Sequence, residues 1–167
     1  MNDAPKYSQI EIERRWLVDL SAVDLSKVQF REIEDLYIAD SRLRLRRIAG
    51  AGELAFKLGK KYGKRTALSE PITNLYLTEL EYRLLSVLPG TRTRKRRYAL
   101  PRGAIDVYVE QSERLAVFEV EFEDERAARD FAPPPFATRE ITGESAFSGV
   151  SLAERGALGV GQVGPRC

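Results

Sequence analysis

Like charges that recur at every second position are the most informative feature of this sequence. Glutamates occupy positions 11 and 13 and again positions 119 and 121, while arginines occupy positions 42, 44 and 46. Because side chains at i and i+2 of an extended strand point to the same face, each group concentrates one sign of charge. Carboxylates are typical ligands of Mg²⁺ and Ca²⁺, and arginines bind phosphate oxygens through paired hydrogen bonds. These residues therefore predict a site for a metal ion and a phosphate-like anion.

The residue types that are absent exclude several kinds of catalytic and metal-binding site. The chain has no histidine, and its one cysteine, Cys167, is the last residue. Histidine-assisted nucleophiles, histidine general bases, an internal disulfide and a cysteine-rich zinc site are therefore excluded. Any bound metal must rely on carboxylates, which favours Mg²⁺, Mn²⁺ or Ca²⁺.

The elements that position these residues are predicted to be strands, because hydrophobic and charged residues alternate with a period of two along most of the chain. We expect eight strands, at roughly residues 9–18, 30–39, 41–49, 53–61, 66–73, 91–100, 103–111 and 115–122. Short connections and the lack of alternating helices predict an antiparallel sheet, open or closed.

Two helices interrupt this pattern. Thr78 and Glu81 form a capping-box pattern that begins the first helix, and Pro89-Gly90 ends it. The second helix is expected from Asp124 to Phe131, because three consecutive prolines follow shortly afterwards.

Length and composition predict a single globular domain. The chain has 167 residues, of which 43% are hydrophobic and 31% charged, with a net charge of +2. We expect one domain over residues 1–158 and a flexible, glycine-rich tail over 159–167. No apolar run approaches the roughly 20 residues of a membrane span, and no signal-peptide pattern opens the chain, so the expected location is the cytoplasm.

Acidic and basic strands are expected to share one face of the sheet. The residues on that face are Glu11, Glu13, Asp106, Glu119 and Glu121 among the acids, and Arg15, Arg44, Arg46, Lys57, Lys61, Lys95 and Arg97 among the bases. The same alternation is typical of a half-exposed sheet with a solvated face. Segregation of the two signs by strand favours a shared space instead, because like charges side by side destabilise a sheet unless something neutralises them. Such a space suits metal cations together with a polyanion.

These motifs resemble, in order, those of the CYTH superfamily, the triphosphate tunnel metalloenzymes. Residues 11–15 (EIERR) resemble its ExExK signature, and the later matches are 43–46 (LRLR), 95–98 (KRRY), 105–107 (IDV), 118–122 (FEVEF), 132–136 (APPPF) and 140–143 (EITG). Each motif alone is weak, but their order and their agreement with the strand faces make the resemblance specific over roughly residues 9 to 154.

The resemblance implies a mainly β fold, an eight-stranded antiparallel barrel closed into a tunnel with a few helices packed outside. It implies that Glu11, Glu13, Asp106, Glu119 and Glu121 bind Mg²⁺ or Mn²⁺, and that Arg15, Arg44, Arg46, Lys57, Lys95 and Arg97 bind phosphates. Lys57 is preferred over Lys60 and Lys61 because its neighbours place it on the inner face. Arg15 and Tyr37 are the expected catalytic residues, although Tyr37 could equally pack at the barrel rim. Trp16 is expected in the core.

Two departures from the family pattern bear on catalysis. Arg15 replaces the lysine that ends the signature, and arginine stays protonated where a lysine of lowered pKa could accept a proton. Residues 147–149 (FSG) occupy the place where many relatives carry a lysine.

Several functions remain open at this stage. The resemblance implies metal-dependent hydrolysis of inorganic triphosphate or a related small-molecule triphosphate. Alternatives are a class IV-type adenylate cyclase and a non-catalytic module that binds triphosphate or polyphosphate. The cluster of arginines at 92–97 raises nucleic-acid binding, but the near-neutral net charge argues against it. The sequence predicts no particular oligomeric state.

Overall fold

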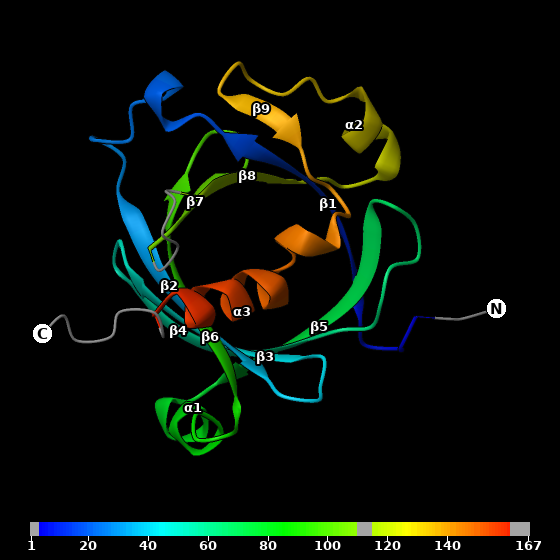
Figure 1. The fold of residues 1–167 in the computed structure, drawn as a ribbon. Coiled ribbons are helices and arrows are strands. Elements are labelled where there is room, and N and C mark those ends of the chain that lie inside the picture. Colours follow the sequence, from blue (N-terminus) through cyan, green and yellow to red (C-terminus); the bar gives the residue numbers. More distant parts are fainter. Residues whose placement is uncertain (1–3, 110–114, 161–167) are drawn as a thin grey trace, which may run out of the picture.

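A closed antiparallel barrel forms the body of the molecule (Figure 1). The computed structural model describes residues 4–109 and 115–160, with nine strands in one sheet in the order β5-β4-β3-β2-β6-β7-β8-β1-β9. The strands are β1 (Gln9–Val18), β2 (Phe30–Ile38), β3 (Leu43–Gly50), β4 (Glu53–Lys61), β5 (Ser69–Leu77), β6 (Gly90–Ala99), β7 (Ala104–Tyr108), β8 (Ala116–Glu121) and β9 (Ala137–Glu140). Pairing of β1 with β5 closes the first eight into a barrel, which confirms the predicted fold class.

Strand β1 closes the barrel because it pairs with three partners. Its edge toward β8 sets Glu13 opposite Glu121 and Arg15 opposite Glu119. On its other edge, the first half pairs with β5 and the second half with β9. Strand β9 lies outside the predicted set, because its four residues, ATRE, show no apolar alternation.

Local turns shift two strand boundaries from their predicted positions. The third strand begins at residue 43 rather than 41, since Asp40 has a φ of 52° and the Ser41 hydroxyl caps the amide of Leu43. The fifth strand runs from 69 to 77 rather than from 66 to 73, because the Thr66 hydroxyl accepts hydrogen bonds from the amides of residues 68 and 69. That turn ends before the strand begins.

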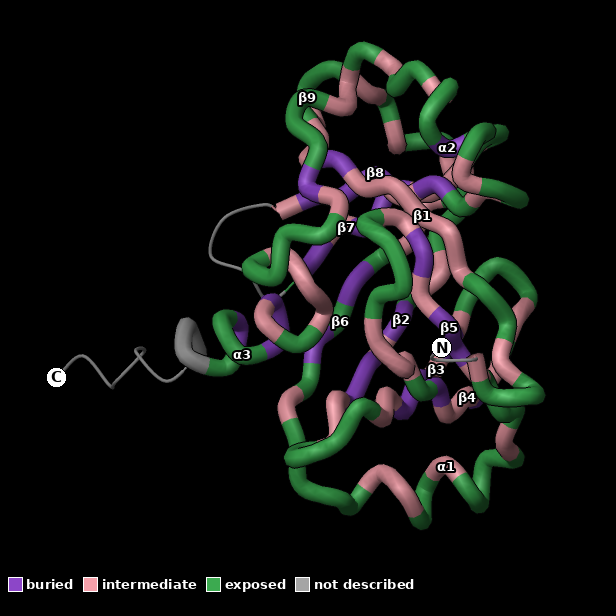
Figure 2. Tube along the Cα trace, turned by 90° about the vertical axis from the view of Figure 1, so that its right-hand side faces the viewer, coloured by how far each residue is buried: buried purple, intermediate pink, exposed green. Residues whose placement is uncertain are grey.

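In the described part of the chain, three α-helices and two short 3₁₀ helices accompany the barrel. Helix α1 (Glu79–Leu85) begins with the predicted capping box, and α2 (Glu125–Asp130) lies within the predicted second helix. Helix α3 (Gly149–Val160) was not predicted, and it includes residues 159 and 160 of the expected tail. The remainder of that tail, 161–167, lies outside the described residues. The 3₁₀ helices are η1 (Leu20–Ala22) and η2 (Ser145–Phe147). Figures 1 and 2 place α1 and α2 outside the barrel and α3 across one of its mouths.

The main apolar cluster lies outside the barrel wall rather than inside it. Trp16, Ile105 and Phe118 point outward from β1, β7 and β8 and pack under residues that follow α2, including Phe131 and Phe136. Trp16 is 2% exposed, in agreement with its predicted place in the core. A second cluster joins Leu152 of α3 to inward-facing Tyr108 and Val117 at the mouth. Between these clusters the barrel interior carries mainly charged side chains, together with the buried isoleucines Ile33, Ile48 and Ile72.

No helix in the described part of the chain is both long enough and apolar enough to cross a membrane.

Candidate functional site

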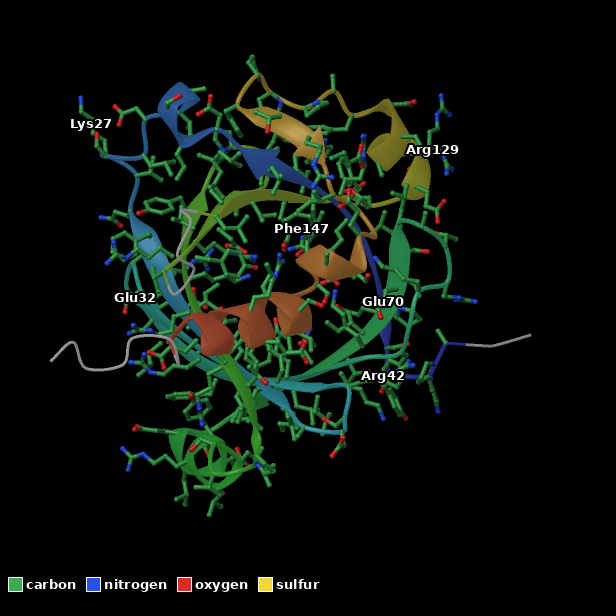
Figure 3. All side chains as sticks on the ribbon, viewed as in Figure 1. Lys27, Glu32, Arg42, Glu70, Arg129 and Phe147 are labelled. Carbon is green, nitrogen blue, oxygen red and sulfur yellow. The ribbon has the colours of Figure 1, made fainter. Side chains whose placement is uncertain are left out.

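Two adjoining cavities occupy the interior of the barrel. The larger, of about 460 Å³, opens toward the α3 end and is lined partly by residues 143–145 and 148–150. The smaller, of about 320 Å³, lies toward the other end. Their shared lining residues, where the cavities meet, are Glu11, Arg44, Arg46, Ile72, Arg97 and Glu121. In Figure 3 Phe147 lies within the outline of the barrel, whereas Lys27 and Arg129 lie at its periphery.

The larger cavity brings together ten of the twelve residues predicted for the site. They are Glu11, Glu13, Arg15, Tyr37, Arg44, Arg46, Lys95, Arg97, Glu119 and Glu121. Lys57 also faces the interior, but it lines the smaller cavity and its ammonium lies 4.6 Å from the centre of the Tyr76 ring. Asp106 lies beneath the cavity wall and is 1% exposed.

Asp106 binds two cations of the neighbouring strand. Its carboxylate accepts hydrogen bonds from Lys95 Nζ at 2.5 Å and from two nitrogens of Arg97 at 2.7 Å each. Burial alone would raise the pKa of Asp106, but Lys95 and Arg97 outweigh that effect and lower it. The carboxylate is therefore ionised, and in this arrangement it fixes the positions of both cations. Arg97 also reaches Glu119 at 3.1 Å.

Asp35 is a site residue that the sequence analysis missed. It lies on β2 opposite Arg46 of β3, and its carboxylate accepts two hydrogen bonds from the Arg46 guanidinium, at 2.7 and 2.8 Å. Arg44 Nε lies 3.8 Å from the same carboxylate. Asp35 shares a strand face with Tyr37, two residues later, so strand parity could have identified it.

Lys61, which was expected on the charged face but passed over in favour of Lys57, also lines the larger cavity. Its ammonium lies 2.5 Å from Glu11, 3.7 Å from Glu13 and 3.8 Å from Glu70. The residue shares the inner face of β4 with Lys57 but lies at the end of the strand nearer the larger cavity. Three carboxylates thus converge on one cation.

Two guanidinium groups retain unused hydrogen-bond donors. The Nε atoms of Arg15 and Arg44 are buried and have no hydrogen-bond partner among the residues that the structure describes. Arg15 is held elsewhere by a 2.9 Å hydrogen bond from its Nη1 to the carbonyl oxygen of Phe147, and its Nε lies 3.6 Å from Glu119. A buried donor without a partner is costly, so both atoms favour an acceptor in the cavity.

The aromatic hydroxyls in the larger cavity favour their protonated form. Burial, together with the charge of Asp35, raises the pKa of Tyr37. Burial also raises the pKa of Tyr108 well above its usual value. Neither phenol is therefore a ready proton acceptor near neutral pH. Tyr37 in addition packs against the start of α3, where a Cβ on Gly149 would lie 1.8 Å from its hydroxyl oxygen.

The carboxylates of the larger cavity fit a hard divalent cation. In residues 4–109 and 115–160, no three of them lie close enough together to form a ready-made metal site. Burial, with the neighbouring charge of Glu119, raises the pKa of Glu13, and burial with the charge of Glu11 raises that of Glu121. A cation among these oxygens would relieve the repulsion that raises both values, and an all-oxygen donor set suits Mg²⁺ or Mn²⁺.

Comparisons with known proteins agree with this geometry. The family model of the CYTH domain matches residues 9–157. The crystal structure of the hypothetical protein NE1496 is similar to this chain, with a TM-score of 0.55 and 25% identity over 86% of this chain and 97% of that chain. The crystal structure of the inorganic triphosphatase NE1496 has a TM-score of 0.55 and 24% identity, over 86% and 93% of the two chains. A search of curated proteins finds no match.

Proposed function

This chain belongs to the CYTH domain family, and from that premise we propose that it hydrolyses inorganic triphosphate, or a related organic triphosphate, inside its tunnel with the help of Mg²⁺ or Mn²⁺. Its structural neighbour NE1496 is an inorganic triphosphatase, and the family relationship makes the same reaction class the first candidate here.

One observation carries the proposal. Six cations from four strands line a single cavity of about 460 Å³, namely Arg15, Arg44, Arg46, Lys61, Lys95 and Arg97. Two of them, Arg15 and Arg44, hold buried Nε donors without a hydrogen-bond partner. A linear chain of phosphates offers many oxygens and dense negative charge, which suits both the number and the spread of these cations. Carboxylates in the same cavity give it the second component, a place for metal ions.

The carboxylates Glu11, Glu13, Glu119 and Glu121 would hold the metal. When bound, Mg²⁺ or Mn²⁺ would neutralise charge on the phosphoryl oxygens and acidify a water molecule. Asp106 is a weaker candidate for a ligand, because Lys95 and Arg97 already occupy its oxygens.

The protein's own contribution is positioning and electrostatic stabilisation. Asp35 and Asp106 orient Arg46 and Arg97, so that these guanidinium groups need little reorganisation when the substrate binds. Arg15 offers a fixed charge and an Nε donor that makes no hydrogen bond to the described residues, but it cannot accept a proton at neutral pH. Burial lowers the pKa of Lys95, although the residue stays hydrogen-bonded to Asp106. Phosphoryl transfer asks mainly for such positioning.

A non-catalytic binding module is the second candidate. The observation that favours it is Arg15 itself, since the family lysine it replaces is the residue that could accept a proton. Under this alternative the tunnel would bind triphosphate tightly and release no phosphate.

A substrate panel separates these functions. Tripolyphosphate, ATP, thiamine triphosphate and long-chain polyphosphate would each be incubated with Mg²⁺ or Mn²⁺, with and without EDTA, while phosphate release and cyclic AMP are measured. We expect phosphate release from tripolyphosphate that stops in EDTA. Binding by calorimetry without phosphate release would instead support the binding module, and cyclic AMP formed from ATP would support a cyclase.

The matched controls are neighbouring residues on the outer face of the same strands. Arg44→Ala is expected to raise KM for tripolyphosphate, whereas Arg47→Ala, on the outer face of the same strand, should leave it unchanged. Equal effects in both variants would argue against a site inside the tunnel.

A further inference from the structure

Residues 140–143 (EITG) lie against Arg15, at the point where β1 changes partners. On this edge β1 pairs with β5 through residues 9–12 and with β9 from residue 16 onward, and Figure 1 shows β9 alongside β1. Arg15 falls between the two pairings. Its backbone amide donates a 2.9 Å hydrogen bond to the hydroxyl oxygen of Thr142, and its carbonyl oxygen accepts one of 2.8 Å from the amide of Ile141. The motif therefore completes the edge of β1 at a residue that lines the larger cavity.

The hydroxyl of Thr142 is itself oriented by Glu140. It donates a 2.7 Å hydrogen bond to a carboxylate oxygen of Glu140, which leaves its lone pairs for the amide of Arg15. The same carboxylate accepts hydrogen bonds of 2.9 and 2.7 Å from Arg14, and these bonds lower the pKa of Glu140. Arg14 Nη1 in turn binds two carbonyl oxygens at the end of α2. A chain of hydrogen bonds thus runs from the outer wall of the barrel to the backbone of Arg15.

The segment that follows holds the side chain of Arg15 as well. The carbonyl oxygen of Phe147, in η2, accepts a 2.9 Å hydrogen bond from Arg15 Nη1. The amide of Glu144 binds the carbonyl oxygen of Ile141 at 3.1 Å, and the amide of Phe147 binds that of Glu144 at 3.0 Å. In Figure 3 Phe147 lies within the outline of the barrel. The backbone and the guanidinium of Arg15 are therefore held by one continuous stretch, residues 140–147.

We propose that Thr142 and Glu140 are positioning residues of the tunnel, which hold Arg15 so that its Nε atom stays available to a phosphate oxygen of the substrate. This inference rests on the proposed function, since it takes a triphosphate as the ligand of Arg15. The Nε atom is buried and makes no hydrogen bond to the described residues. An arginine side chain loses much rotamer entropy when it becomes ordered, and ordering it beforehand removes that cost from substrate binding.

Packing of the segment depends on a different residue of the motif. Ile141 is 0% exposed and belongs to the apolar cluster at the mouth of the barrel. Thr142 is only half-buried and Glu140 is exposed, so both act here through their polar atoms. Thr142→Val keeps the shape of the side chain and removes only the hydroxyl. We therefore expect this variant to fold.

Binding and turnover of tripolyphosphate test the proposal. Thr142→Val should raise KM by about 10-fold, and should raise the Kd measured by calorimetry in EDTA to a similar extent, because Arg15 is no longer held in place. Thr142→Ser keeps the hydroxyl and should restore the wild-type values. Thr138→Val is the matched control on β9, since the Thr138 hydroxyl binds the carbonyl oxygen of Leu17 at 3.2 Å rather than Arg15. It should leave KM unchanged.

A double-mutant cycle distinguishes positioning of Arg15 from a general loosening of the barrel. In a chain that carries Arg15→Ala, Thr142→Val should change KM by less than about 2-fold, because the side chain that it positions is gone. An equal rise in KM with and without Arg15 would overturn the proposal. So would a Thr142→Val variant whose KM and Kd equal those of the wild type.

Hydrogen exchange at the amide of Arg15 separates this inference from the proposed function. Thr142→Val should accelerate exchange at this amide whether or not a ligand is bound, and unchanged exchange would overturn the inference while leaving the proposed function intact. A wild-type chain that neither binds nor hydrolyses tripolyphosphate would instead overturn the proposed function, and with it the role of Thr142 and Glu140 in substrate binding.

Discussion

Asp35 and Arg46 form a doubly hydrogen-bonded ion pair inside the barrel, with donor–acceptor distances of 2.7 and 2.8 Å. The pair joins neighbouring strands β2 and β3, and Asp35 is only 2% exposed. It fixes one arginine of the site before any substrate arrives.

Asp35→Asn should destabilise the fold strongly at neutral pH. Removing one partner of a buried ion pair leaves the other charge uncompensated, at a cost of about 3–5 kcal/mol in the free energy of unfolding. Unfolding in denaturant measures this loss in the free energy of unfolding. Glu34→Gln, on the outer face of the same strand and 3.5 Å from Arg47, should cost less than about 1 kcal/mol.

The loss caused by Asp35→Asn should depend on pH. Burial alone would raise the pKa of Asp35, but the Arg46 guanidinium outweighs burial and holds it below the usual 3.8. A carboxyl group whose pKa is lower in the folded state than in the unfolded chain stabilises the fold while it is ionised. This contribution is fully present above the pKa of the group in the unfolded chain, and it is lost as the pH falls through the pKa of the folded state. The difference between wild type and variant should therefore be constant from about pH 7 to 5 and shrink below about pH 4. A difference that grows on acidification would contradict this account.

Arg44→Ala should weaken substrate binding more than it slows turnover. The lost guanidinium carries a buried Nε that makes no hydrogen bond to any described residue, so a phosphate oxygen would gain a charge-assisted hydrogen bond there. Such a bond contributes about 1.5–3 kcal/mol, which corresponds to about a 10- to 150-fold rise in KM for tripolyphosphate. Arg47→Ala, on the outer face of the same strand, is the control and should leave KM unchanged.

Arg15 should act as a positioning group rather than as a proton acceptor. Arg15→Lys is expected to keep or raise kcat, because lysine restores the family residue, whereas Arg15→Ala should raise KM by about 10- to 150-fold. Steady-state kinetics on tripolyphosphate compare the three chains. Loss of kcat in Arg15→Lys with unchanged binding would show a specific catalytic role for arginine.

Lys61→Met should tighten the binding of Mg²⁺ or Mn²⁺. The ammonium lies within 3.8 Å of Glu11, Glu13 and Glu70 and competes with a metal ion for their oxygens. Titration calorimetry with the metal alone measures the affinity. Lys60→Met, at the exposed neighbouring position, should leave it unchanged. Weaker metal binding in Lys61→Met would mean that these carboxylates do not hold the ion.

Gly149→Ala should disturb the packing of α3 against the barrel. A Cβ there would lie 1.8 Å from the hydroxyl oxygen of Tyr37 and 2.6 Å from its Cζ, so the ring or the helix must move. Overpacking of this kind costs about 1–3 kcal/mol. Tyr37→Ala should remove the penalty in a double-mutant cycle, whereas Tyr37→Phe should relieve it only in part, since the ring carbon stays. If the losses in the free energy of unfolding caused by Gly149→Ala and Tyr37→Ala were additive in the double variant, the expected contact between residues 149 and 37 would be contradicted.

The sequence by itself determined which side chains lie on the charged face of each strand. Parity along a strand is a local property, so Glu13, Arg46 and Glu119 could each be assigned to the charged face of its own strand without any knowledge of the neighbouring strands. The capping box at Thr78 was equally local and was confirmed. Closure of the sheet was implied by the family resemblance, since the alternation alone left an open sheet with a solvated face possible.

Only the tertiary structure decided which of these charges meet. The pairing of Asp35 with Arg46, and of Lys61 rather than Lys57 with the carboxylates, depends on the register between strands and on the position of each residue along the tunnel. Helix α3 was missed for a related reason. Its glycines give weak helical propensity, and it is held by long-range packing of Leu152 and Ala153, both fully buried at the mouth of the barrel. Such contacts form only once distant segments fold together, and no local pattern in the chain encodes them.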